Sequence, residues 1–141
     1  MDFYEEAVLF HLTAIRQMLV LPQAAILEHD SGGRETWSAY PDFLALDFKR
    51  PGIEVVEVTK LPTLKKIRGK CDQVYLKKVE QIIREKILRG HLASFPLNWH
   101  FIVRSQMIAK VQAEIDRNSL GSIVEVSSLE KLLEEIGRQL P

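Results

Sequence analysis

Two acidic residues, Asp42 and Glu57, lie in strongly apolar runs on either side of a Pro-Gly pair at 51–52. Glu57 is part of the valine-rich run 53–59, and a carboxylate in such a run is costly to bury unless another group compensates its charge. A divalent cation would do so, as would an ion pair with a lysine. At the edge of a sheet, water alone would solvate the group. The residue types therefore allow a metal site beside two ordinary alternatives.

The predicted geometry of the hairpin favours the metal site. Residues 43–48 and 53–59 are rich in apolar and β-branched side chains, which is typical of strands joined by a turn. A four-residue loop at 49–52 would pair Leu44 with Glu57, and a two-residue loop at 51–52 would pair Leu46 with Glu57. In both registers Asp42 shares a face with Glu57, because side-chain direction repeats every two residues.

The expected separation of the two carboxylates suits a hard cation. Asp42 and Glu57 would be diagonal neighbours, ~7–8 Å apart, so that a cation could bridge them. Two carboxylates completed by water and a phosphate oxygen are typical of a magnesium site.

The elements around the hairpin follow from apolar periodicity and capping residues. A helix is predicted over 3–21, ended by Pro22, followed by a short strand over 24–28 and a loop over 29–38. After the hairpin, Asp72 is a suitable N-cap for a long helix to about Arg89, stopped by Gly90.

The C-terminal third is predicted to add two strands and two helices. A strand is expected over 98–104, a helix over 105–116, a strand over 122–126, and a helix to 139 that begins at a capping box of Ser127 and Glu130. The whole chain, 1–141, is thus predicted to be one α/β domain: a mixed central β-sheet flanked by helices in the order α-β-β-β-α-β-α-β-α.

This order and these residues resemble the PD-(D/E)XK nuclease superfamily, whose fold is restriction-endonuclease-like. The resemblance is carried by Pro41-Asp42, the hairpin, Glu57 and Lys60, and it covers about 3–104. In scale the chain is similar to the small Holliday-junction resolvases, which have an acidic residue early in the first helix. Glu5 or Glu6 would take that place here.

The resemblance implies a metal-dependent DNA endonuclease. Asp42, Glu57 and Glu6 would hold Mg²⁺ or Mn²⁺, which lowers the pKa of a bound water and neutralises charge on the phosphate. Lys60 would orient that water and stabilise the developing negative charge. Such enzymes act as homodimers, each subunit cutting one strand, so a homodimer is expected.

The lysine departs from the usual motif. Thr59 occupies the position two residues after the acid, and Lys60 would face away from the metal in a regular strand. A bulge or the end of the strand would turn it back. Lys70 or Lys77, from the following helix, would be a spatial substitute.

Basic residues gather directly after the hairpin. The segment 60–89 holds ten basic and three acidic residues, an excess of +7, whereas the whole chain has a net charge of zero. A solvated helix face is the ordinary interpretation of such a run, and contact with a polyanion is the functional one. The candidates for contact with nucleic acid are Lys65, Lys66, Arg68, Lys70, Gln73 and Lys77.

Other features limit the function classes. The sequence has no zinc-ligand spacing, Gly-rich phosphate loop or Gly-x-Ser-x-Gly elbow. His29, Trp37 and Tyr40 lie near the candidate site in sequence, although packing is the better interpretation of the aromatic residues. A single cysteine, Cys71, excludes an internal disulfide, and no apolar run reaches the ~18 residues of a membrane helix. We expect a cytoplasmic protein without a membrane partner.

Two other hypotheses remain open at this point. A non-catalytic module of the same fold would bind nucleic acid or a protein, and the misplaced lysine supports it. An unrelated α/β interaction domain would match the motif by chance. A larger complex could supply the targeting in either case.

Overall fold

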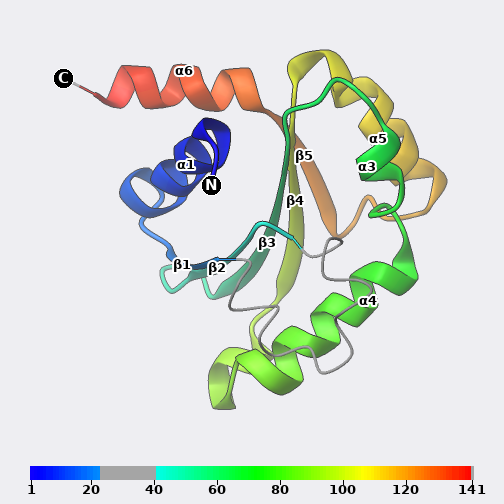
Figure 1. The fold of residues 1–141 in the computed structure, drawn as a ribbon. Helices are drawn as coiled ribbons and strands as arrows, with labels where there is room; N and C mark the ends of the chain where they lie inside the picture. Colours follow the sequence, from blue (N-terminus) through cyan, green and yellow to red (C-terminus); the bar gives the residue numbers. More distant parts are fainter. Residues whose placement is uncertain (23–40, 141) are drawn as a thin grey trace.

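The computed structural model describes residues 1–22 and 41–140 and shows one five-stranded mixed sheet with helices on both faces (Figure 1). The strands lie in the sheet in chain order. The β1–β2 and β2–β3 pairs are antiparallel, and the β3–β4 and β4–β5 pairs are parallel. Their bounds are β1 Leu19–Pro22, β2 Phe43–Asp47, β3 Gly52–Thr59, β4 Leu97–Val103 and β5 Val124–Ser128.

The helical elements follow the order expected from the sequence, with short turns added. They are α1 Phe3–Phe10, α3 Lys65–Arg68, α4 Gln73–Ile82, α5 Ile108–Arg117 and α6 Leu129–Gln139, the π-helical turns His11–Ile15 and Ile83–Ile87, and the 3₁₀ turns Gly90–Ser94 and Ser105–Met107. No helix in the described ranges combines the length and apolarity needed to cross a bilayer. The strand expected over 24–28, the loop over 29–38, and His29, Trp37 and Tyr40 lie outside the described residues.

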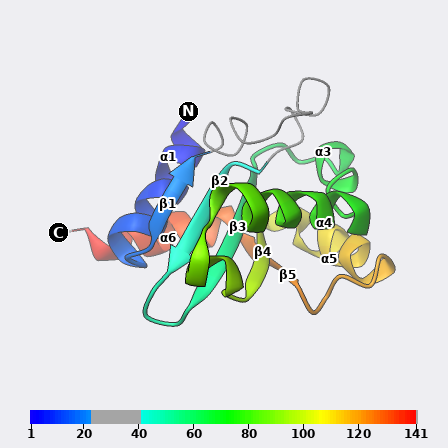
Figure 2. The same cartoon turned by 90° about the horizontal axis from the view of Figure 1, so that it is seen from below.

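Each face of the sheet has its own apolar core. Helices α1 and α6 cover one face, and α3, α4 and α5 lie on the other (Figures 1 and 2). Within β3, Ile53 and Val55 belong to the core beneath α4 and α5, whereas Val56 and Val58 belong to the core beneath α1 and α6. A central strand covered on both faces explains why this run is apolar without alternation.

The first helix is shorter than the sequence predicts. Helical structure ends at Ile15, and Gln17 has a left-handed φ of 57°. Residues 19–21, predicted to be helical, instead form β1 and pair with β2. The error has a physical reason: an apolar run next to a sheet edge gains cross-strand pairing, and Pro22 is tolerated at the end of an edge strand.

The hairpin loop matches neither of the two predicted alternatives, 49–52 and 51–52. Asp47 pairs with Gly52, so the loop is 48–51, and Leu44 pairs with Val55 instead of Glu57. The side chain of Asp47 accepts hydrogen bonds from the main-chain N–H groups of Lys49 (2.9 Å) and Arg50 (3.2 Å). This aspartate turn starts the loop at Asp47.

The last helix is capped by Ser128, not by Ser127. The Ser128 Oγ accepts from the Lys131 N–H at 3.1 Å. Ser127 Oγ bonds instead to His100, and Glu130 accepts from the Ser105 N–H at 3.0 Å. The predicted capping box is therefore wrong by one residue. The predicted cap at Asp72 is confirmed, since its side chain accepts from the Val74 N–H.

The cap predicts a measurable loss of stability. Replacing Ser128 by alanine removes an acceptor from the first turn of α6, which should lower the free energy of unfolding by about 1 kcal/mol. Urea denaturation measures this value. The exposed Ser122 provides the matched control, and Ser122→Ala should change the free energy by less than about 0.5 kcal/mol. Equal values for the two variants would contradict the assignment of the cap.

Candidate active site

Asp42 lies opposite Glu57, at the point where the β2–β3 ladder ends. The Asp42 N–H donates to the Val56 carbonyl at 3.0 Å, and Asp42 Oδ2 accepts from the Val58 N–H at 2.8 Å. The two contacts flank Glu57 on both sides, so the Asp42 carboxylate takes the place of a main-chain acceptor beside it. The strands thus bring together the two acidic residues that the sequence singled out.

Glu57 has no exposed surface. The Lys70 Nζ lies 2.5 Å from its Oε1, and the Lys66 Nζ lies 3.9 Å from the same oxygen. Neither Oε1 nor Oε2 has a hydrogen bond of good geometry among the described residues, and the two lysine contacts of Oε1 are ion pairs. The pKa of Glu57 is raised to about 7: burial is the largest cause, the charge of Asp42 adds to it, and Lys70 and Lys66 oppose it.

The lysine beside the acids comes from the segment after α3. The main-chain N–H groups of Lys70 and Cys71 both donate to the Ile67 carbonyl, at 2.9 and 3.0 Å. Ile67 and Cys71 are buried in the core beneath the sheet, which holds Lys70 inward between them. Lys70 is only 4% exposed, which is unusual for a lysine.

Lys60 makes a different contact. Its Nζ lies 2.7 Å from Asp2 Oδ2, and its side chain is about half exposed. Asp2 is the N-cap of α1, so this pair ties the end of β3 to the first helix. Thr59, in the usual position of the motif lysine, is buried and its Oγ1 has no hydrogen-bond partner among the described residues.

Of the two early acidic residues, Glu5 is partly buried and feels the charge of Asp42, whereas Glu6 is exposed. Burial raises the pKa of Glu5, and the nearby Asp42 charge adds to the shift. Burial also raises the pKa of Asp42. The hydrogen bond from the Val58 N–H and the charges of Lys70 and Lys66 partly offset this increase. A small pocket of about 80 Å³ next to this site is lined by Glu5, Lys66 and others. The structure therefore favours Glu5 over Glu6 as the acidic residue of α1 close to the site, and a metal-ligand role for either one stays a prediction.

The other predicted basic contacts are distributed along α3 and α4. Lys65 and Lys77 are exposed. The Arg68 Nε lies 3.4 Å from Glu114 Oε1, and Gln73 Nε2 donates to the Asn118 carbonyl at 3.3 Å. Of the six candidates, the structure brings Lys66 and Lys70 to the acidic pair.

Sequence reasoning missed Tyr75. Burial raises the pKa of its phenol, and the charges of Glu57 and Asp42 add to the shift, so the hydroxyl lies within the field of both acids. Its ring packs against Trp99, with ring centroids 5.7 Å apart. The sequence held no signal for this position, because Tyr75 follows the N-cap of a helix and belongs to no motif.

The side chains near Asp42 offer few ligands for a metal ion. Among the residues that the structure describes, no group of three or more His, Cys, Asp or Glu side chains is arranged to hold a metal ion. The predicted three-ligand set of Asp42, Glu57 and Glu6 is therefore not assembled, and Asp42 and Glu57 remain as an acidic pair. Mg²⁺ and Mn²⁺ are commonly held by one or two carboxylates together with water and phosphate oxygens.

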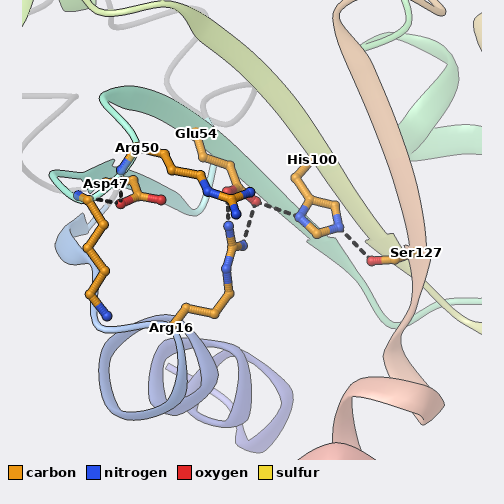
Figure 3. A network of polar contacts seen from close by, with 7 residues as sticks. Arg16, Asp47, Arg50, Glu54, His100 and Ser127 are labelled. Carbon is orange, nitrogen blue, oxygen red and sulfur yellow. Dashed lines mark hydrogen bonds and ion pairs between the residues drawn. The ribbon is translucent and has the colours of Figure 1, made fainter.

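A second polar network lies at the hairpin end of the sheet (Figure 3). Arg16 donates to both carboxylate oxygens of Glu54, at 2.9 and 2.7 Å. His100 then joins Glu54 (Nδ1–Oε1, 2.6 Å) to Ser127 (Nε2–Oγ, 2.5 Å). Hydrogen bonds from His100 and Arg16 lower the pKa of Glu54 to about 2 in spite of its burial.

This network is best explained as structural. Glu54 and His100 line a cavity of about 430 Å³. The order carboxylate, imidazole, hydroxyl is that of a catalytic triad. However, Ser127 is not among the described residues that line the cavity, and Arg16 neutralises the Glu54 carboxylate. The contacts join the turn after α1 to three strands.

Comparisons with models of protein families, with curated proteins and with solved structures return no match for this chain.

The buried Glu57 carboxyl makes the stability of the fold depend on pH. Its pKa is about 7 in the folded protein, against an ordinary value of 4.5. Between these values the folded state holds a proton that the unfolded state releases. We therefore expect the contribution of Glu57 to the free energy of unfolding to fall by roughly 2–3 kcal/mol as the pH rises from about 4.5 to 7.

Urea denaturation of the wild type and of Glu57→Gln across this range isolates the effect. The glutamine does not titrate, so the difference in unfolding free energy between the two proteins should change within the window and level off above it. Glu54, with its pKa near 2, titrates below the window. A difference that stays constant from pH 4.5 to 7 would contradict the raised pKa.

Proposed function

We propose that this protein is a metal-dependent DNA endonuclease of the PD-(D/E)XK superfamily, with a restriction-endonuclease-like fold. The observation that carries the proposal is the buried Glu57 carboxylate beside Asp42, with Lys70 and Lys66 on the same oxygen. A purely structural acid in this position would be expected to have its hydrogen bonds satisfied. Here one oxygen lacks a donor among the described residues, as expected of an oxygen that binds a ligand.

Asp42 and Glu57 would hold Mg²⁺ or Mn²⁺, and the charge of Glu5 would add to the negative field at Asp42. When bound, the metal would lower the pKa of a coordinated water and neutralise charge on the phosphate. Lys70 takes the part that the motif lysine has elsewhere: its ammonium group is buried at the acidic pair, where it can orient the attacking water and stabilise charge that develops on the phosphate.

The basic residues of α3 and α4 would provide contacts to the phosphates of the DNA. Both helices lie on the same face of the sheet (Figure 2). Lys70, between them in the chain, contacts Glu57. Contacts of this kind are independent of sequence and weaken with salt. The proposal includes a homodimer, because one site in each subunit cuts one strand of a duplex.

One observation favours a second candidate, a non-catalytic DNA-binding module of the same fold. Thr59 replaces the motif lysine on its strand, and the Lys70 ammonium already neutralises Glu57 without a metal. A protein that had lost catalysis could keep the acid as one half of a buried ion pair.

Plasmid cleavage with Mg²⁺ or Mn²⁺ distinguishes the two candidates. Asp42→Asn and Glu57→Gln should each lower the cleavage rate by at least about 100-fold, because each removes a charged ligand from the metal. Glu134→Gln, at an exposed position on α6, is the matched control and should cleave as the wild type does. Cleavage that survives both site substitutions eliminates this site. Binding of DNA without cleavage of any form supports the module.

The proposal predicts different effects on the cleavage rate for substitutions of Lys70 and of Lys60. Lys70→Met should reduce the cleavage rate much more than Lys60→Met, because Lys70 contacts Glu57 and Lys60 pairs with Asp2. Rates measured under single-turnover conditions, with a salt titration of DNA binding, separate chemistry from affinity. A larger loss for Lys60→Met would return the role to Lys60.

A further inference from the structure

Lys70 and Lys66 bind Glu57 in a way that obstructs the proposed metal site. The Lys70 Nζ lies 2.5 Å from Glu57 Oε1. The side chains of this pair are almost completely buried, with exposed fractions of 6% for Lys70 and 0% for Glu57. A divalent cation on this carboxylate would stand next to the lysine ammonium. Two positive groups so close in a poorly solvated site repel strongly.

The Lys70 ammonium is the closer of the two obstructing groups, and its side chain extends from a fixed main chain. Ile67 is fully buried and Cys71 is 2% exposed, so the main chain on either side of Lys70 is anchored in the core. Because the main chain is held in place, release of the ammonium group from Glu57 would have to take place by rotation about the Lys70 side-chain bonds.

Lys66 connects this buried pair to the surface. Its side chain is 51% exposed, while its Nζ remains 3.9 Å from Glu57 Oε1. An anionic oxygen that binds Lys66 from solution would therefore arrive beside the Glu57–Lys70 pair. A phosphate there offers Lys70 a second anionic partner, which is the interaction needed to draw its ammonium away from Glu57.

We propose that Lys70 couples the two ligands of the site: a DNA phosphate draws Lys70 away from Glu57, and Glu57 then becomes available to the metal. This inference rests on the proposed function and adds to it the order in which DNA and metal bind. The free protein binds Mg²⁺ or Mn²⁺ weakly, and the metal enters together with a phosphate. By reciprocity, the metal also strengthens binding of DNA.

The experiment measures Mn²⁺ affinity by electron paramagnetic resonance at pH 8, with and without a short duplex that carries uncleavable phosphorothioate linkages. In the wild type, the duplex should tighten Mn²⁺ binding by about tenfold or more. In Lys70→Met, Mn²⁺ should bind more tightly than to the wild type without DNA, and the gain caused by the duplex should shrink several-fold. Asp42→Asn with the same duplex serves as the DNA blank, because it measures the Mn²⁺ that the duplex binds without the protein site.

Lys110→Met is the matched control, since Lys110 is an exposed lysine on α5. It should show the wild-type affinity and the wild-type gain. Circular dichroism confirms that each variant is folded.

The outcomes separate this inference from the proposed function. Tight Mn²⁺ binding to the free wild type, abolished by Asp42→Asn, retains the metal site and overturns the coupling by Lys70. An undiminished gain from the duplex in Lys70→Met overturns the coupling as well. Absence of Mn²⁺ binding above the DNA blank in all proteins eliminates the metal site and the coupling together.

Discussion

The burial of one carboxylate governs this structure. Glu57 lies in the central strand of a sheet covered on both faces, where an ionised group loses its water. Desolvation alone would keep it protonated, and Lys70 opposes that tendency from 2.5 Å. The result is a carboxyl with a pKa near 7, poised between the neutral and the charged form. Removing either partner would leave the other buried without compensation.

The surrounding fold can be understood as the means of holding this pair. The parallel β3–β4 pair buries Glu57, and the Asp42 carboxylate closes the end of the β2–β3 ladder through the Val58 N–H. The chain then leaves β3, forms the short helix α3, and returns Lys70 to the same carboxylate between two buried anchors. Thr59 stands two residues after Glu57 in β3, and the lysine that contacts the carboxylate comes instead from the segment between α3 and α4.

Patterns that depend on short-range physics were predictable from the sequence. The valine-rich β3, a turn between β2 and β3, and the N-cap at Asp72 follow from residue types a few positions apart, and the predicted α/β class with a mixed sheet flanked by helices agrees with the structure. The prediction that even positions of β2 share a face with odd positions of β3 holds for Leu44 and Val55. The register itself matches neither predicted alternative, because the Asp47 side chain starts the loop directly after Asp47.

What failed depended on contacts between distant residues. The run Leu19–Pro22 becomes a strand only because β2 lies beside it, and Ser127 gives up the cap because His100 binds its hydroxyl. The pairing of Lys60 with Asp2 and the choice of Glu5 over Glu6 depend on where the start of α1 meets the end of β3. Tyr75 has no local signal.

The central claim is that Asp42 and Glu57 together bind a divalent cation when a phosphate is present. The most direct measurement is the anomalous scattering of a crystal of the protein with an uncleavable duplex and saturating Mn²⁺. The account predicts one peak within coordinating distance of both carboxylates, with the Lys70 ammonium moved from Glu57 to a phosphate oxygen. A folded protein with bound duplex, no peak there, and the Glu57–Lys70 ion pair unchanged would contradict it.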